Sequence, residues 1–205
     1  LLTDSPRRLF FHYLGPTIGS SMVTSIYILA DTIMVGQGVG DAGLAALTIF
    51  MPIVASFFAL GLLLGVGGGV LMSVAKGSGN ESLAHKYFST AMISAAVVSV
   101  CFAVFGAIFF DPMMYALGAD TTNIELVRGY GLCYTVSAPL FIFSSSLQSF
   151  IRNDKSPRHA MIAVLTGSGL NILLDYLFIF VFKTGMFGAS FATSIGTSIT
   201  VCILI

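Results

Sequence analysis

Two carboxylates that lie within long apolar stretches are the residues of this sequence best suited to chemistry. Asp175 stands in the run Asn171-Ile-Leu-Leu-Asp175, and Asp31 lies near the end of another apolar stretch. On insertion scales, an Asp at the centre of a membrane-spanning helix costs at least about 2.5–3.5 kcal/mol. A carboxylate kept at that cost is expected to bind a proton or a cation.

Asn171 and Asp175 are four residues apart, so on a helix both side chains share one face, about 6 Å apart along the axis. An amide oxygen one turn from a carboxylate completes a site for a small cation, or holds the carboxyl group in its protonated form. The alternative is a hydrogen bond between helices that serves packing alone. Since Asp175 has no nearby cation in its own apolar stretch, we favour the functional interpretation.

Asp31 ends a polar stripe along its own apolar stretch. The members of the stripe recur at spacings of three and four: Thr17, Ser20, Thr24, Tyr27 and Asp31. A helix surrounded by lipid would not carry this stripe, so it is expected to face the interior of the bundle or a water-filled cavity. A proton or cation site is favoured there over a structural role.

Polar residues in other apolar stretches are candidates to line the same interior. They are Tyr130, Tyr134 and Thr193, in addition to Tyr27. Two carboxylates in one dry bundle repel each other, and protonation or cation binding relieves the repulsion. Such a site suits ion-coupled transport.

His12, four residues before Pro16, is interpreted as a structural or interfacial histidine.

The composition indicates the class of protein that carries these residues. The 205 residues are 56% hydrophobic and 9% charged, whereas a soluble domain carries roughly 25% charge. This excludes a soluble enzyme. Nine Lys and Arg balance nine Asp and Glu, and there is no basic run of the kind that binds nucleic acid. Cys101, Cys133 and Cys202 fall inside apolar runs, which argues against a disulfide framework or a zinc site.

The length accommodates about six membrane-spanning helices, at about 30–35 residues for a span and its loop. The apolar ranges are 9–35, 44–75, 87–109, 126–151, 160–182 and 185–205. Pro16 and Pro139 fall within the first and the fourth and are expected to kink them, with Pro16 a candidate hinge. Gly61, Gly65 and Gly69 in the second predict close helix packing.

The loop charges predict the orientation in the membrane. Arg128 and Lys183 lie on one side. Seven cations lie on the other, before the first span and after the second and fourth: Arg7, Arg8, Lys76, Lys86, Arg152, Lys155 and Arg158. By the positive-inside rule, the N-terminus of this multi-pass protein is expected in the cytoplasm.

Motifs of soluble enzymes fail on their context. The run Gly38-Val-Gly-Asp-Ala-Gly43 matches a dinucleotide-binding fingerprint, but an apolar helix precedes it and no βαβ unit surrounds it. A glycine-rich turn between two helices is the better interpretation. An intramembrane enzyme would need a nucleophile and base or a metal constellation, and the sequence offers only the two aspartates. We therefore do not expect an enzyme.

Four motifs stand in this chain in a characteristic order and spacing. They are Ala30-Asp31-Thr32-Ile33-Met34-Val35-Gly36 leading to Gly43-Leu44-Ala45-Ala46, then Arg152-Asn153, then Asn171-Ile-Leu-Leu-Asp175, and finally Gly188-Ala189-Ser190-Phe191-Ala192-Thr193. With them, the chain resembles the N-terminal half of a transporter of the multidrug and toxic compound extrusion (MATE) family, closest to its bacterial multidrug exporters.

The resemblance implies an all-α membrane protein of twelve helices in two lobes. Residues 1–205 would form the N-terminal six-helix lobe, and the C-terminal lobe would be absent from the chain. It also implies alternating-access export of cationic, amphipathic compounds across the bacterial cytoplasmic (inner) membrane, with sodium ions or protons as coupling ions and no other cofactor. By motif, Asp31, Asn171, Asp175 and Thr193 would form the cation site, with Tyr130 as a further member.

Two alternatives are kept. A lipid-linked oligosaccharide flippase of the same superfamily would carry cationic residues inside its cavity to hold pyrophosphate, and none of the nine cations here falls at mid-span. A structural six-helix subunit that transports nothing would leave the paired carboxylates unexplained.

Overall fold

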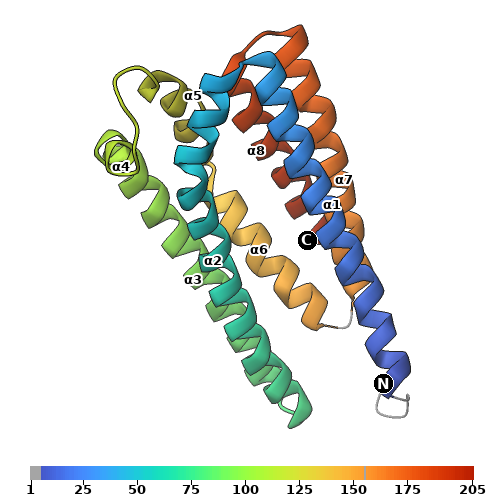
Figure 1. Cartoon of the computed structure of the whole chain (residues 1–205). Helices are drawn as coiled ribbons and strands as arrows, with labels where there is room; N and C mark the ends of the chain where they lie inside the picture. The colour runs from blue at the N-terminus through green and yellow to red at the C-terminus, as the bar shows by residue number, and fades with distance from the viewer. Residues whose placement is uncertain (1–5, 155) are drawn as a thin grey trace.

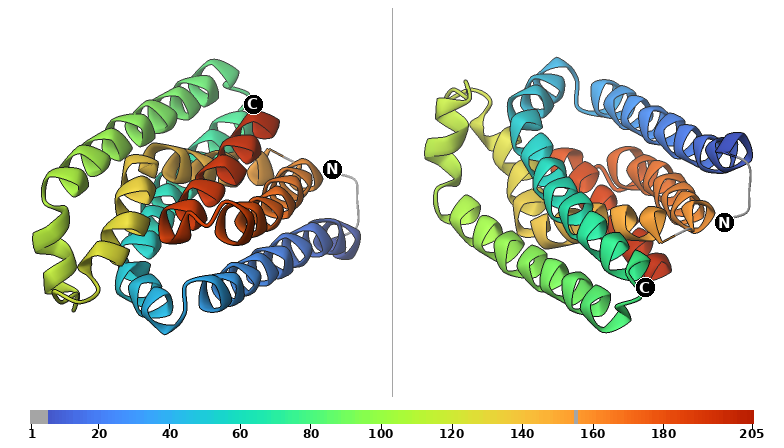
Figure 2. Two further views of the ribbon diagram at one scale, coloured as in Figure 1. Left: turned by 90° about the horizontal axis from the view of Figure 1, so that it is seen from above. Right: turned by 90° about the horizontal axis from the view of Figure 1, so that it is seen from below.

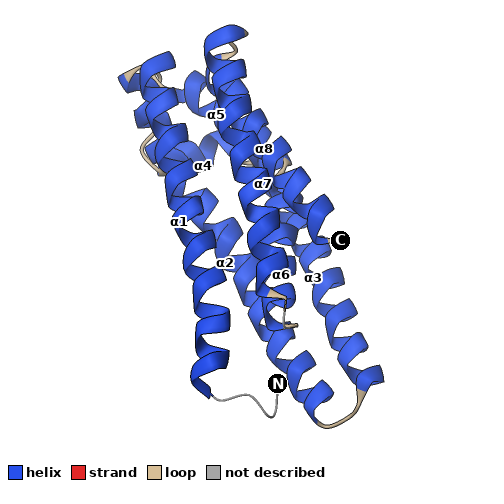
Figure 3. Cartoon of the chain, turned by 90° about the vertical axis from the view of Figure 1, so that its right-hand side faces the viewer, coloured by secondary structure: helices blue, strands red, loops and turns tan. Residues whose placement is uncertain are grey.

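The computed structural model describes residues 6–154 and 156–205, without the side chains of residues 6–9 and 11–13. The side chains of Arg7, Arg8, His12 and Lys155, considered above, therefore lie outside the description. Over the described residues the chain forms helices joined by short loops, with no strand (Figures 1 and 3). The helices are α1 (Pro6–Gly38), α2 (Asp41–Gly77), α3 (Glu81–Ile108), α4 (Phe110–Ala116), α5 (Ile124–Val136), α6 (Ala138–Asn153), α7 (Pro157–Tyr176), the π-helical segment η1 (Leu177–Val181) and α8 (Gly185–Leu204).

The expectation of an all-α membrane protein with six spans is confirmed. Within the described chain, α1, α2, α3, α7 together with η1, and α8 are each long and apolar enough to cross a membrane. The sixth span is α5 followed by α6, which meet at an angle of 53°. Large apolar side chains cover the outside of the bundle, as at Leu63 and Ile108, where a lipid environment accepts them.

The bend in this broken span lies where Pro139 predicts a kink. Helix α5 ends at Val136, and α6 begins at Ala138 with Pro139 in its first turn. A proline there removes no internal hydrogen bond, because the first turn of a helix lacks partners for its N–H groups. Pro16 behaves differently, since α1 continues through it without a break.

The spans form two packed groups, which contact each other mainly through α8. Helix α2 packs against α3 and α6, while α7 packs against α1 and α8, and α8 also contacts α5 and α6. Seen from either end, α1 and α3 lie at opposite edges of the bundle (Figure 2). Helix α1 makes fewer contacts with α2 than with α7, so α7 is its principal support.

Only Val39 and Gly40 connect α1 to α2. The N–H groups of both residues donate to the carbonyl of Val35, at 2.8 and 3.2 Å. Gly40 has a φ of 91°, a conformation that side chains disfavour. The glycine-rich run that matched a nucleotide fingerprint is therefore a tight turn between two helices, as its context indicated.

Backbone contact through glycine joins α2 to α6. A Cβ atom on Gly61 would approach the carbonyl oxygen of Ile142 to 2.8 Å, and one on Gly65 would approach the Cα atom of Ser146 to 2.8 Å. The hydroxyl of Ser146 donates to the carbonyl of Gly61 at 2.9 Å. The predicted small-residue series is the surface on which the two helices meet.

We expect Gly65→Ala to lower the free energy of unfolding by about 1–3 kcal/mol, because the added methyl group collides with backbone rather than with a flexible side chain. Gly67→Ala is the matched control, since nothing lies within 4 Å of its Cβ position. Thermal unfolding of the purified protein in detergent measures both. Equal stability of the two variants would contradict this account of the α2–α6 contact.

Candidate functional site

The site begins with a second close helix contact, between α7 and α8. A Cβ atom on Gly196 would approach the carbonyl oxygen of Gly167 to 2.8 Å, and one on Gly167 would approach that of Gly196 to 2.6 Å. The hydroxyl of Thr200 reaches across to the carbonyl of Ala163 at 3.4 Å. The two helices are thus fixed next to the positions of Asn171 and Thr193.

Asn171 and Thr193 join α7 to α8 by a buried hydrogen bond. The amide nitrogen of Asn171 donates to Oγ1 of Thr193 at 3.3 Å, and the Thr193 hydroxyl donates to the carbonyl of Ala189 at 3.0 Å. Their exposed fractions are 3% and 7%. This arrangement uses the amide nitrogen and leaves Oδ1 of Asn171 buried without a hydrogen-bond partner.

The two carboxylates carry three of the four buried side-chain oxygens that have no hydrogen-bond partner in the described chain. Asp175 is fully buried, and neither of its oxygens has a hydrogen-bond partner. Oδ1 of Asp31 is also buried without a partner, and the two residues are close enough for their charges to interact. Since a buried ionised carboxylate without a partner is costly, this arrangement can take up protons or cations.

The π-helical segment η1 begins two residues after Asp175. Its wide turn is closed by bonds from Phe182 N–H to the Leu177 carbonyl and from Thr184 N–H to the Phe178 carbonyl, both at 2.9 Å. Single π-helical turns are frequent at functional sites. The sequence carries no clear local sign of this segment, because a π-turn depends on packing around the helix.

The candidate tyrosines separate into two places. Tyr27 lines a cavity described below, whereas Tyr130 and Tyr134 are buried in an aromatic cluster of α2, α5 and α6. The ring of Tyr134 stacks on Phe141 with centroids 4.1 Å apart, and Tyr130 meets Phe50 edge-on at 5.6 Å. Tyr130 and Tyr134 therefore belong to the packed core, and neither lines the cavity.

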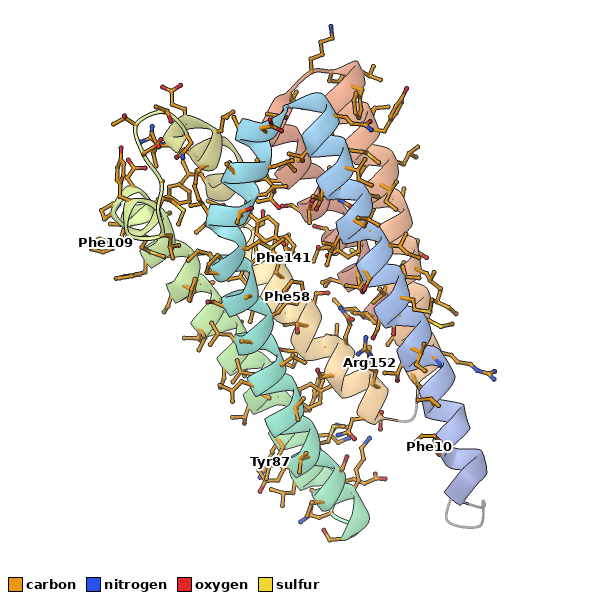
Figure 4. The ribbon with its side chains drawn as sticks, viewed as in Figure 1. Phe10, Phe58, Tyr87, Phe109, Phe141 and Arg152 are labelled. Atoms are coloured by element: carbon orange, nitrogen blue, oxygen red, sulfur yellow. The ribbon has the colours of Figure 1, made fainter. Side chains whose placement is uncertain are left out.

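A cavity of about 90 Å³ lies between α1, α2, α6, α7 and α8. It reaches Asn171 and Thr193, and its aromatic walls are Phe58 and Phe141 (Figure 4), together with Tyr27. The remaining lining residues are Thr24, Ser144, Gln148, Val164, Gly167, Ser168, Gly196, Thr197 and Thr200. Sequence reasoning missed the polar members from α6 and α8, because isolated Ser and Thr residues in apolar spans carry no distinctive pattern.

The polar stripe of α1 faces this interior over part of its length. Thr24 and Tyr27 line the cavity, and Ser20 is buried and donates to the carbonyl of Pro16 at 2.8 Å. Thr17 is exposed, so the stripe leaves the interior one turn before Ser20.

Sequence comparison identifies the family of this chain. The MatE family model matches residues 16–177. The chain belongs to the MATE family. The multidrug export protein MepA of Staphylococcus haemolyticus is 28% identical to this MATE chain over 192 residues, which cover 94% of the chain and 42% of MepA. The FAD transporter of Shewanella oneidensis is 26% identical over 182 residues, which cover 88% of the chain and 40% of that protein.

Structure comparison agrees with the sequence. The fold matches the outward-facing conformation of a multidrug resistance MATE family transporter of the MOP superfamily, with a TM-score of 0.91 and 26% identity, over 98% of this chain and 44% of that one. The chain therefore spans less than half the length of the MATE transporters that it matches. It is a multi-pass membrane protein, and the members of the MATE family are transporters rather than enzymes.

We expect Thr193→Val to destabilise the protein by about 1–2 kcal/mol, because it leaves the buried amide nitrogen of Asn171 without an acceptor. Thr166→Val is the matched control, since the hydroxyl of Thr166 is exposed and bonds only within its own helix, to Ile162. Thermal unfolding in detergent compares the two. A control as unstable as the Thr193 variant would argue against a role for the bond between α7 and α8.

Proposed function

We propose that this chain is one lobe of a cation-coupled antiporter that exports cationic, amphipathic compounds, with sodium ions or protons as the coupling ion. The observation that carries the proposal is the set of buried oxygens without hydrogen-bond partners on Asp31, Asn171 and Asp175. Carboxylate and amide oxygens are the ligands that hard cations take in proteins, and a carboxylate is also a proton acceptor.

The packing of α1 suggests how ion binding would act. With both carboxylates ionised, repulsion between Asp31 and Asp175 acts across the contact between α1 and α7. A bound cation or proton removes that repulsion and stabilises the packed arrangement. An exported cation that competes for the same carboxylates favours a second arrangement of α1 and α7. Each ligand shifts the equilibrium between the two arrangements only by the difference in its affinity for them. Pro16 is the hinge that we propose for α1.

The lining of the cavity supports cationic substrates over the flippase alternative. Its described residues include no Lys or Arg, whereas a site for pyrophosphate would need them. The aromatic side chains of Tyr27, Phe58 and Phe141 are suited to contact an amphipathic cation through their π-faces. The name of the related MepA, a multidrug export protein, points to the same class of substrate.

We further propose that the protein lies in a bacterial cytoplasmic membrane with the N-terminus in the cytoplasm. The distribution of seven and two cations over the two sides of the chain supports this orientation. The partners of the lobe would be the bilayer, the exported cation and a second, C-terminal lobe that completes the substrate path.

Asp175→Asn in the full-length protein is expected to reduce drug export to background while the protein still folds, because the amide keeps the shape of the side chain and cannot take up a proton. The measurement is uptake of ethidium into inverted membrane vesicles under an imposed sodium or proton gradient. The gradient that drives uptake in the wild type identifies the coupling ion.

Asp41→Asn is the control, because Asp41 is an exposed carboxylate in the first turn of α2. It is expected to transport as the wild type does. Export at the wild-type rate by the Asp175 variant would remove this carboxylate from the coupling mechanism.

A further inference from the structure

Arg152 is a half-buried cation without an ion pair in the described part of the chain. Expected in the loop after the fourth span, it lies instead in the last turn of α6, which continues to Asn153. Two other cations near the ends of the bundle have carboxylate partners: Lys76 pairs with Asp154 and Arg128 with Asp111, each at 2.5 Å.

Arg152 ends a series of polar side chains along one face of α6. Its Nη2 atom donates to Oε1 of Gln148 at 3.2 Å, and the amide nitrogen of Gln148 donates to Oγ of Ser144 at 3.2 Å. Ser144 and Gln148 both line the cavity. Arg152 therefore lies one helical turn beyond that lining, and Figure 4 shows it on the side of α6 that is turned toward α1.

The guanidinium group retains most of its hydrogen-bonding capacity. It has five N–H donors in a planar fork, and Gln148 accepts one hydrogen bond from it. A partly desolvated cation with free donors is best satisfied by an oxyanion, and the fork matches the two oxygens of a phosphate in a bidentate arrangement. Because α6 ends at the next residue, Arg152 stands where a membrane span meets the headgroup region.

We propose that Arg152, oriented by Gln148, is a binding position for a phosphate group at the end of α6. The phosphate has two sources of the same chemistry: the headgroup of an anionic phospholipid, or a soluble phosphate compound at this end of the cavity. The position lies on α6, apart from Asp31, Asn171, Asp175 and Thr193 on α1, α7 and α8. It is therefore separate from the proposed site of the coupling ion.

A structural role for Arg152 makes a different prediction. A cation in the last turn of a helix also stabilises the carbonyl end of the helix dipole, and that contribution needs no ligand. The two roles are separated by asking whether the effect of the side chain depends on added phosphate.

The test is thermal unfolding of the purified full-length protein in an uncharged, phosphate-free detergent. One arm adds phosphatidylglycerol, and the other adds sodium pyrophosphate at constant ionic strength. At least one is expected to raise the melting temperature of the wild type in a saturable way. Saturable stabilisation by phosphatidylglycerol identifies a lipid headgroup as the source, and stabilisation by pyrophosphate identifies a soluble compound.

Arg152→Gln is expected to weaken the apparent affinity of the stabilising ligand by about 10- to 100-fold, the factor for loss of one charge-assisted hydrogen bond. Arg158→Gln is the matched control, because Arg158 is exposed and the change in net charge is the same. It is expected to bind as the wild type does. If Arg152→Gln fails to fold, Arg152→Lys, which keeps the charge and lacks the fork, is expected to show an intermediate affinity.

Two results overturn the proposal. One is a wild type that neither ligand stabilises. The other is an equal response of the Arg152 and Arg158 variants to the ligand, which would leave Arg152 with the helix-dipole role alone.

Discussion

Backbone contact between helices at glycine is the constraint on which the rest of this structure depends. Lipid chains are as apolar as the side chains that face them, so helices in a membrane gain little from hydrophobic association and rely on close packing. Gly61 and Gly65 bring α2 against α6, while Gly167 and Gly196 bring α7 against α8. The second contact fixes the distance across which Asn171 reaches Thr193.

The same close packing explains why the carboxylates lack partners. Helix backbones satisfy their own hydrogen bonds and so offer no N–H group to a carboxylate on a neighbouring helix. The amide nitrogen of Asn171, one helical turn before Asp175, is already bonded to Thr193. Buried oxygens of Asp31, Asn171 and Asp175 are thus left as unpaired acceptors, an arrangement suited to a cation or a proton.

The sequence predicts the parts of this molecule that depend on local properties. Hydropathy over about 20 residues indicates a span, and an Asp within such a stretch stands out because of its cost there. The bend at Pro139 follows from the chemistry of one residue. By contrast, η1 packs against α1 and α8, and its own residues do not indicate these contacts. The cavity could not be predicted either, since its polar lining comes from four separate helices, α1, α6, α7 and α8.

Because only two residues connect α1 to α2, a tilt of α1 pivots about its C-terminal end. Its C-terminal end, Gly38, is joined to α2 through Val39 and Gly40, and Asp31 lies seven residues, or roughly 10 Å, from that end. Pro16, the proposed hinge, lies 22 residues, or roughly 33 Å, from the same point. A rigid tilt of this segment that moves Asp31 by 1 Å therefore moves Pro16 by about 3 Å. In the proposed mechanism, binding of the coupling ion at Asp31 and Asp175 would be converted in this way into a larger displacement at the other end of α1.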